Sequence, residues 1–207
     1  MGKRLFDLVT ATGLLLATAP IIALAALAIY LESGRPVFFV QTRVGQDGTP
    51  FSLYKLRSLP PGDHDPAART PEASPIGRVL RRWALDELPQ LWNVLRGDMS
   101  LVGPRPILPS EAAGYDDRQR RRLDVRPGLT GWAQIHGRNA LPWTERIEHD
   151  LWYVDHAGLW TDLKILCYTP VVLLSGVGIR GPGDRDPSTA EVQQAEPASS
   201  VDASSNA

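Results

Sequence analysis

An apolar segment near the N-terminus constrains this chain more than any other feature of its sequence. Residues 8–31 contain no acidic, basic or histidine side chain, and about 20 such residues are enough to cross the hydrocarbon core of a bilayer as a helix. Lys3 and Arg4 precede the segment, and Glu32 and Arg35 follow it. The sequence therefore predicts a helix that enters or lies in a membrane.

Three topologies are open for this segment. A cleaved signal peptide would use Lys3 and Arg4 as its basic region, but the apolar run exceeds the usual core of about 7–15 residues. A spanning helix has the right length, although basic residues on both flanks give no clear orientation. A re-entrant helix, which enters the membrane and returns to the same face, would leave both flanks on one side.

Pro20 lies at the centre of the apolar run and favours the re-entrant arrangement. Proline removes one backbone donor and clashes with the carbonyl four residues earlier, here that of Leu16, so a kink is expected. The hydroxyls of Thr12 and Thr18 are available to bond a carbonyl freed in this way. Proline kinks also occur in spanning helices, so Pro20 alone does not decide the topology.

Composition narrows the class of protein. The chain has 207 residues, 43% hydrophobic and 22% charged, which suits one globular domain with appendages. Its single cysteine, Cys167, excludes a disulfide framework and a multi-cysteine zinc site, and we expect this thiol to be buried and inert. The net charge of −1 and the lack of a recognised module argue against nucleic-acid binding. The histidines have no metal-ligand spacing, and we expect them at the surface.

Regular elements are predicted along the rest of the chain. Residues 36–44 and 51–57, joined by a turn with two glycines, indicate a β-hairpin. Helices are expected over 76–85 and over about 86–95, the second with Asp86 as its N-cap. Further on, the pattern predicts a charged helical stretch, an amphipathic helix and an interfacial apolar helix, over residues 110–124, 144–157 and 163–179 in turn.

Proline, glycine and small polar residues mark the loops. Residues 60–75 are expected to form a surface loop, residues 102–109 an extended turn segment and residues 127–131 a tight loop. Residues 184–207 hold one Arg against five acidic residues. With almost no large apolar side chains, residues 181–207 are predicted to form a disordered acidic tail.

Adjacent carboxylates at Asp86 and Glu87 form the most informative polar pair. At a helix start they would meet free backbone N–H groups and the positive end of the helix dipole, an arrangement that also suits phosphate. Neighbouring helical side chains project about 100° apart, so one carboxylate could attack phosphorus while the other holds Mg²⁺. The simpler alternative is a structural N-cap followed by a first-turn acid.

Basic residues around this pair support phosphate chemistry. Phosphoryl transfer needs cations around the phosphate. The alternatives are ordinary surface ion pairs and a solvated strand edge. The residues concerned are Arg78, Arg81, Arg82, Arg96 and Arg105 near the pair, with Lys55 and Arg57 at the end of the expected hairpin.

Several longer stretches resemble the bacterial sugar transferase family, the monotopic polyprenol-phosphate phosphoglycosyl transferases, in its small single-domain form. The resemblance covers about residues 3–180, in family order. The stretches are Phe39-x-Gln-x-Arg-x-Gly45, Lys55-Leu-Arg-Ser58, Leu85-Asp-Glu-Leu-Pro-Gln-Leu-Trp-Asn-Val-Leu95, Gly97-Asp-Met-Ser-Leu-Val-Gly-Pro-Arg-Pro106, Arg126-Pro-Gly-Leu-Thr-Gly-Trp-Ala-Gln134, Gly137-Arg-Asn139 and Asp150-x-x-Tyr153.

The resemblance implies a reaction and roles for individual residues. A UDP-sugar would give its sugar 1-phosphate to undecaprenyl phosphate and release UMP, with Mg²⁺ and a covalent phosphosugar-aspartate intermediate. Asp86 would be the nucleophile and Glu87 the metal partner, with Lys55 as a third catalytic residue. The implied substrate-binding residues are Arg57, Arg81, Arg105, Gln134, Arg138 and Asp150, with Arg105 at the nucleotide end.

The resemblance also implies the fold and its location. The expected protein is α+β, predominantly helical and monotopic, with an N-terminal re-entrant helix broken at Pro20, a β-hairpin and interfacial amphipathic helices. The family often has serine before this proline, where this chain has Ala19. The expected organisation is a membrane segment over 1–35, a catalytic domain over 36–180 on the cytoplasmic face of the bacterial inner membrane, and the tail over 181–207.

Rival functions stay open at this level. One is a catalytically silent, membrane-bound scaffold of polysaccharide assembly, and another is a one-step transferase in which Asp86 or Glu87 acts as a base. The sugar, the oligomeric state and the glycan (exopolysaccharide, capsule, O-antigen or lipopolysaccharide, or glycoprotein glycan) cannot be inferred from the residues.

Overall fold

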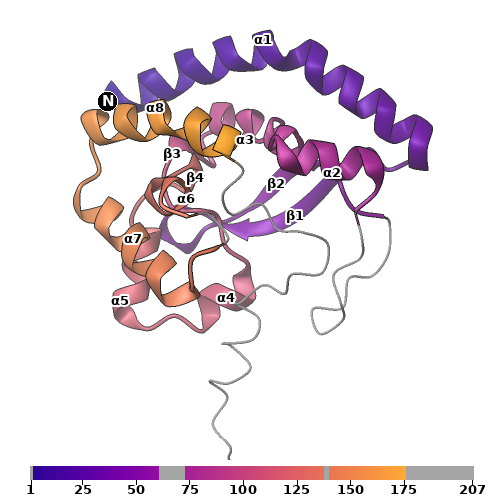
Figure 1. Cartoon of the computed structure of the whole chain (residues 1–207). Helices are drawn as coiled ribbons and strands as arrows, with labels where there is room; N and C mark the ends of the chain where they lie inside the picture. Colours follow the sequence, from indigo (N-terminus) through magenta and orange to yellow (C-terminus); the bar gives the residue numbers. More distant parts are fainter. Residues whose placement is uncertain (1, 61–72, 138–139, 176–207) are drawn as a thin grey trace, which may run out of the picture.

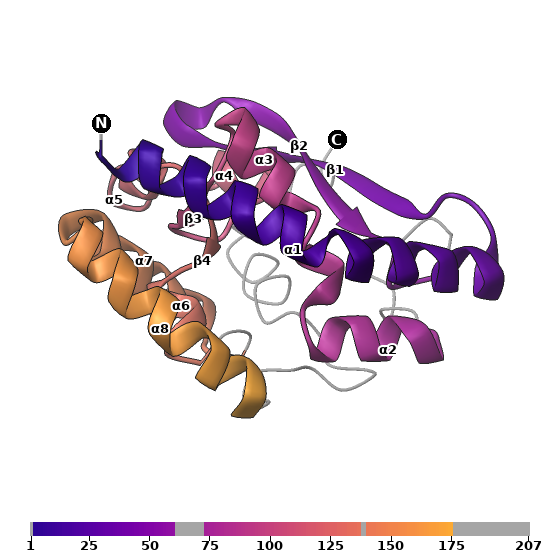
Figure 2. The same cartoon turned by 90° about the horizontal axis from the view of Figure 1, so that it is seen from above.

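A long N-terminal helix lies across one face of a small α+β domain. The computed structural model describes residues 2–60, 73–137 and 140–175. Helix α1 (Gly2–Ser33) is arched over this face, and α8 (Leu159–Ser175) and α2 (Pro75–Arg82) flank it on the same side (Figures 1 and 2). The described part is mostly helical, as predicted.

Strands β1 (Phe38–Val44) and β2 (Pro50–Leu56) form the predicted antiparallel hairpin. Phe39 pairs with Lys55 across it. The turn contains a short 3₁₀ segment, Gln46–Gly48, in which Asp47 and Gly48 have positive φ angles of 55° and 77°. Gly48 adopts a positive φ without a steric penalty, so the turn sequence determines where the chain reverses between the two strands.

A second, parallel pair of short strands was not predicted. β3 (Ser100–Val102) pairs with β4 (Gly128–Thr130). β4 lies in the segment expected to be a tight loop, and β3 ends at Val102, where the extended turn segment was expected to begin. Two glycines allow the chains to approach here: a Cβ added to Gly128 would lie 2.0 Å from the backbone nitrogen of Gly103. Strands of three residues show no usable hydrophobic alternation, which explains why the sequence pattern missed them.

The helix that follows the carboxylate pair starts later than expected. Residues Leu85–Glu87 form a 3₁₀ turn entered through Ala84, whose φ of 52° is left-handed. Helix α3 (Gln90–Arg96) begins only after Pro89. The prediction that Asp86 is the N-cap of this helix is therefore wrong, and its carboxylate is available for other contacts.

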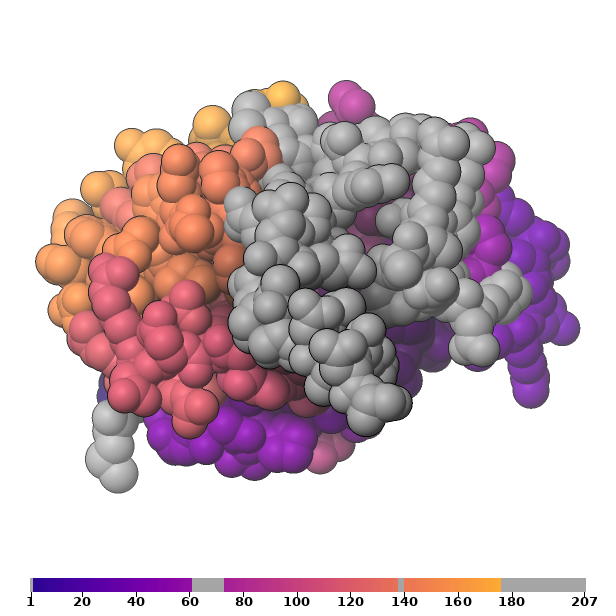
Figure 3. Space-filling view, turned by 90° about the horizontal axis from the view of Figure 1, so that it is seen from below, coloured from indigo at the N-terminus to yellow at the C-terminus, as the bar shows by residue number. Residues whose placement is uncertain are grey.

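Helices α4, α5 and α7 form one flank of the side seen from below in Figure 3. The expected helical stretch 110–124 is interrupted at Gly114 and by the Asp116 cap. The tail 181–207 and most of the predicted loop 60–75 lie outside the described residues. The elements are α4 (Pro109–Ala113), α5 (Asp117–Arg120), a 3₁₀ turn (Arg121–Leu123), α6 (Trp132–Ile135) and α7 (Trp143–Asp155).

Helix α1 shares its inner face with the core of the domain. Ala11 packs in one buried cluster with Leu91 and Met99, and Ile29 packs in another with Leu80. Most of its other apolar side chains are exposed, including Leu16, Leu24 and Leu31. Among the described residues, α1 is long and apolar enough to cross a membrane. Its outer surface is one that lipid would favour.

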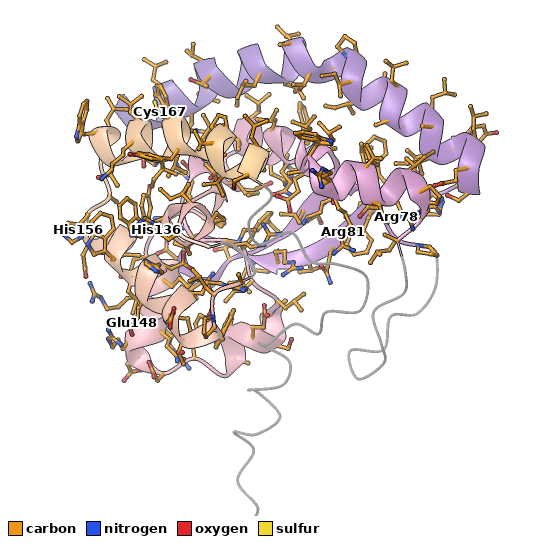
Figure 4. All side chains as sticks on the ribbon, in the orientation of Figure 1. Arg78, Arg81, His136, Glu148, His156 and Cys167 are labelled. Atoms are coloured by element: carbon orange, nitrogen blue, oxygen red, sulfur yellow. The ribbon has the colours of Figure 1, made fainter. Side chains whose placement is uncertain are left out.

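The helix continues through Pro20 and is bowed rather than folded back on itself (Figure 1). The hydroxyls of Thr12 and Thr18, which were expected to be available for a freed carbonyl, donate hydrogen bonds to the carbonyls of Leu8 and Leu14. Cys167 on α8 is exposed, so the prediction of a buried thiol is wrong. It is labelled at the edge of α8 nearer α1 in Figure 4.

Polar residues tie the N-terminal end of α1 to the domain. The buried carboxylate of Asp7 accepts hydrogen bonds from the hydroxyl of Ser100 at 2.9 Å and from the amide of Leu101 at 3.1 Å. Lys3 forms an ion pair with Asp162 of α8. Buried polar groups of this kind fix the register of a helix, because any other position leaves them without partners.

The side chain of Arg4 caps the C-terminus of α3. Its guanidinium donates to the carbonyls of Val94 at 2.6 Å and Leu95 at 2.9 Å. The last carbonyls of a helix lack partners within the helix, and a cation is stabilised there by the helix dipole. The helix that follows the carboxylate pair is thus capped by a residue of α1.

The other end of α1 is also held by the domain. Arg57, at the end of the hairpin, donates to the carbonyls of Ser33 and Gly34. The amide of Ile76, at the start of α2, donates to the carboxylate of Glu32 at 3.2 Å. Both ends of the apolar helix therefore contact the same domain.

Replacing Asp7 by alanine tests this attachment. We expect Asp7→Ala to lower the free energy of unfolding by about 2 kcal/mol, because the Ser100 hydroxyl and the Leu101 amide would stay buried without an acceptor. The exposed Asp124 serves as the matched control, and Asp124→Ala should change the free energy of unfolding by less than about 0.5 kcal/mol. Thermal unfolding in detergent, read by circular dichroism, would measure both; equal effects would contradict the proposed attachment.

Candidate active site

A cavity of about 520 Å³ opens between the hairpin, the 3₁₀ turn that carries the carboxylate pair, and α6. One part of its wall is charged and another part is apolar. The lining residues are Pro36, Phe38, Phe39, Arg43, Lys55, Leu56, Arg57, Ser58, Leu59, Pro60, Arg81, Ala84, Asp86, Glu87, Arg105, Ala133, Gln134 and Arg146.

Asp86 and Glu87 reach this cavity because of the turn that precedes them. The left-handed Ala84 reverses the chain after α2, and the 3₁₀ turn then presents two successive carboxylates. Asp86 is 9% exposed, and the hydroxyl of Ser58 lies 3.4 Å from its Oδ2. The pair thus lies at the junction of α2, α3 and the end of the hairpin.

Two cations hold Glu87 in place. Its Oε1 accepts hydrogen bonds from Lys55 Nζ at 3.0 Å and from Arg105 Nη2 at 2.8 Å. Burial alone would raise the pKa of Glu87, but the charges of Arg105 and Lys55 hold that pKa far below its ordinary value. At neutral pH Glu87 is therefore an anion that holds two cations at the cavity.

Asp86 is in a different electrostatic position. Burial, and then the neighbouring Glu87 carboxylate, raise its pKa, while the cations Lys55, Arg81 and Arg105 oppose the increase. Burial also lowers the pKa of Lys55, against the attraction of Glu87. Two adjacent carboxylates with opposite pKa shifts are typical of sites where they have different roles.

The structure brings most of the predicted site residues together. Lys55, Arg57, Arg81, Arg105 and Gln134 all line the cavity with the carboxylate pair. Arg81 extends from α2 on the side away from α1 (Figure 4). Among the described residues, no partner accompanies the buried amide nitrogen and oxygen of Gln134. An amide without partners in a cavity wall is suited to bind a polar ligand.

Asp150 is not part of the cavity wall, contrary to its prediction as a substrate-binding residue. Its carboxylate is fully buried and pairs with Arg122, with 2.7 Å between Asp150 Oδ2 and Arg122 Nε. The ion pair joins α7 to the 3₁₀ turn after α5, so Asp150 stabilises the fold. Arg138, the other predicted residue of this region, lies outside the described residues.

Arg43 and Arg146 were not predicted, although both line the cavity. Each carries a signal that sequence reasoning can use. Arg43 lies four residues after Phe39 in β1, so both point to the same face of the strand. Arg146 lies four residues before Asp150 in α7, so it shares the buried face of that helix.

The three histidines in the described part of the chain do not line this cavity. His136 and His156 lie on the opposite flank from Arg81, together with Glu148 (Figure 4). His136 stacks on His149, with ring centroids 5.0 Å apart, and contacts Trp132 in a tilted arrangement at 4.2 Å. Within the described residues, no group of three or more His, Cys, Asp or Glu side chains is arranged to hold a metal ion.

The oxygen donors present fit one kind of metal. Asp86 and Glu87 offer hard carboxylate oxygens beside a cationic cavity. Mg²⁺ is commonly bound by one or two carboxylates together with substrate phosphates, and it keeps several water ligands. The pair therefore fits Mg²⁺ bound with a phosphate substrate, and not a cage formed by protein residues alone.

Comparison with known proteins identifies the relatives of this chain. A family model described as bacterial sugar transferase matches residues 1–176. The chain is 47% identical over 181 residues to the uncharacterized sugar transferase EpsL of Bacillus subtilis (strain 168), covering 86% of this chain and 90% of that protein.

Two further relatives have names that state an activity. The undecaprenyl-phosphate glucose phosphotransferase of Komagataeibacter xylinus is 44% identical over 186 residues, covering 82% of this chain but 35% of that protein. The UDP-glucose:undecaprenyl-phosphate glucose-1-phosphate transferase of Caulobacter vibrioides is 43% identical over 192 residues, covering 84% of this chain and 70% of that protein.

The charge cluster can be tested through stability. Glu87→Gln should lower the free energy of unfolding by about 2 kcal/mol at pH 7, because Lys55 and Arg105 lose their common anion. The pKa of Glu87 is depressed below its ordinary 4.5, so its contribution is present above that pH and declines as the pH falls below it.

The measurement is thermal unfolding of the wild type and Glu87→Gln in detergent between pH 7 and pH 3. We expect the difference between them to narrow below pH 4.5, the ordinary pKa of the group. The exposed Glu145→Gln is the matched control and should show a small difference at every pH. A gap between wild type and Glu87→Gln that widens in acid would refute the assignment.

Proposed function

This chain belongs to the bacterial sugar transferase family, and we propose that it transfers a sugar 1-phosphate from a UDP-sugar to undecaprenyl phosphate, releasing UMP. One observation carries the proposal: the buried carboxylate of Asp86 faces a cavity whose wall includes Lys55, Arg81 and Arg105. The names of the relatives supply the substrate class, and the cavity supplies the chemistry. A catalytically silent scaffold would have no use for such a buried group of charges facing a cavity.

In the first step, an oxygen of the Asp86 carboxylate attacks the phosphorus bonded to the sugar. The bond from that phosphorus to the oxygen shared with UMP breaks, and its electron pair leaves with UMP. The ionised form of Asp86 is the nucleophile; burial and the Glu87 charge raise its pKa, and the cations Lys55, Arg81 and Arg105 oppose that increase in favour of the ionised form. The product is a covalent aspartyl phosphosugar.

In the second step, a phosphate oxygen of the acceptor attacks the same phosphorus. The bond to Asp86 breaks and its electron pair restores the carboxylate. The products are a diphosphate-linked lipid sugar and the free enzyme. Two successive displacements at one phosphorus require that donor and acceptor reach Asp86 in turn, which a cavity with a charged and an apolar wall allows.

The cations act where negative charge collects. Lys55 and Arg105 are already oriented by Glu87, so their charge need not reorganise during the reaction. Asp86 and Glu87 would also hold Mg²⁺ with the diphosphate, and the ion would supply further neutralisation of charge at the phosphorus. Gln134 would bind a polar group of the donor through its unpartnered amide.

We further propose that α1 enters the bilayer from one face without crossing it. The contacts of both its ends with the same domain support this topology: Arg4 and Asp7 at one end, Ser33 and Gly34 at the other. The exposed apolar side chains of α1 and α8 would then lie in the lipid. The acceptor and the UDP-sugar would meet at the cytoplasmic surface of the inner membrane.

The nucleophile assignment is tested with a panel of UDP-sugars, Mg²⁺ and undecaprenyl phosphate. Asp86→Asn should reduce UMP release by at least about a thousandfold, because the variant lacks the attacking oxyanion. Asp155→Asn, at an exposed ion pair with Arg121, is the matched control and should stay near the wild-type rate. Near wild-type release by Asp86→Asn would overturn the assignment; release that requires both substrates would favour one-step transfer.

The topology is tested by labelling with a membrane-impermeant maleimide in a Cys167→Ser background. Gly2→Cys and Asp124→Cys, each introduced alone, should be labelled in inverted membrane vesicles and protected in spheroplasts. Both positions are exposed on the protein, so protection reports the membrane. Labelling of position 2 from the outer side would show that α1 spans the bilayer.

A further inference from the structure

Arg57 lies where the end of the apolar helix meets the cavity. It is only 7% exposed. Its Nη2 donates to the carbonyl of Ser33 at 3.1 Å, to the hydroxyl of Ser33 at 2.6 Å and to the carbonyl of Gly34 at 3.0 Å. Gly34 has a left-handed φ of 68°, which ends α1 and turns these carbonyls toward the guanidinium. One side of Arg57 is thus used to cap α1.

The other terminal nitrogen of Arg57 has no such role. Nη1 is buried, and among the described residues it has no hydrogen-bond partner. A buried, charged donor without an acceptor is costly and is rare in folded proteins. Arg57 also lines the cavity. These observations indicate that an anionic ligand in the cavity supplies the missing acceptor.

The residues around Arg57 show what else this ligand carries. Pro36, Phe38 and Phe39 line the same cavity, and the two phenylalanines are 48% and 39% exposed. Leu31, two residues before Ser33 on α1, is 74% exposed. Arg57 therefore lies at a boundary between an apolar surface and a charged cavity. A phosphate on a long apolar chain matches both sides of that boundary.

We infer that Arg57 binds the phosphate of the lipid acceptor through Nη1, with Pro36, Phe38 and Phe39 contacting the first part of its chain. The inference rests on the proposed function and specifies the acceptor subsite within it. Ser58, the next residue, lies 3.4 Å from Asp86, so a phosphate held by Arg57 is close to the carboxylate that carries the phosphosugar. Because α1 orients Arg57, the seating of the membrane helix also positions the acceptor.

The inference predicts a separation between the two substrates. In Arg57→Gln, the KM for undecaprenyl phosphate should rise at least about tenfold, whereas the KM for the UDP-sugar should change less than about threefold. Arg57→Lys retains the positive charge but lacks the two terminal guanidinium nitrogens, so it should raise the KM for undecaprenyl phosphate by an intermediate amount. A damaged fold would affect both substrates, so this separation is not expected from a purely structural role.

Two control variants complete the experiment. Ser33→Ala removes the hydroxyl that accepts a hydrogen bond from Arg57 Nη2 and leaves Nη1 unchanged. The KM for undecaprenyl phosphate should therefore change less than about twofold. Arg82→Gln makes the same substitution at an exposed arginine outside the cavity wall and should behave as wild type. Inorganic phosphate, tested as a competitor, should inhibit weakly and equally in wild type and Arg82→Gln, because it lacks the apolar chain.

The outcomes separate this inference from the proposed function. An unchanged acceptor KM in Arg57→Gln, or an equal rise for both substrates, would overturn the acceptor subsite while leaving the transferase activity intact. If inorganic phosphate inhibited the wild type with an affinity similar to that of the lipid acceptor, Arg57 would be assigned to a free phosphate. Wild-type protein that releases no UMP from any UDP-sugar would instead refute the proposed function.

Discussion

The structure depends on the attachment of both ends of an apolar helix to one domain. Lipid would cover the outer surface of α1, but its ends carry Lys3, Arg4, Asp7 and Glu32, which need polar partners. The domain supplies those partners at the end of α3, in β3, in α8 and at the start of α2. As a consequence, the elements that form the cavity and the surface that faces lipid are parts of one packed unit, with Ala11 and Ile29 in its buried clusters.

Within this unit, charge is distributed so that two adjacent carboxylates differ. The charges of Arg105 and Lys55 lower the pKa of Glu87 and favour its ionised form, whereas burial raises the pKa of Asp86 and opposes its ionisation. The free-energy cost of burying these charges is offset by their mutual contacts. The cluster of charges creates a region where a phosphate anion is stabilised. The same cavity continues to an apolar wall, so water-soluble and membrane-bound substrates can be brought to one carboxylate.

The sequence predicted the features that have local signals. The hairpin was identified from its strands and turn, and the pair Asp86–Glu87 from two charges between apolar neighbours. Lys55, Arg57, Arg81, Arg105 and Gln134 were placed in one site by resemblance, and the structure brings them to one cavity. Contacts between distant segments could not be predicted: the β3–β4 pair is too short to show a period, and the Asp150–Arg122 ion pair depends on packing between two helical segments. The 3₁₀ turn before Pro89 also lacked a signal, because its residues fit a helical pattern equally well.

The attachment of α1 has a consequence for how the chain is made. Its polar partners are synthesised long after it: Val94 and Leu101 follow Arg4 and Asp7 by 90 and 94 residues, and Asp162 follows Lys3 by 159 residues. Contacts between such distant residues form slowly, because a long loop must close before they are gained. During translation the first helix therefore exists without its domain, and the bilayer is the environment that can hold its apolar surface until α8 has been added. The membrane would thus act as a folding partner of this protein before it serves as the place of its reaction.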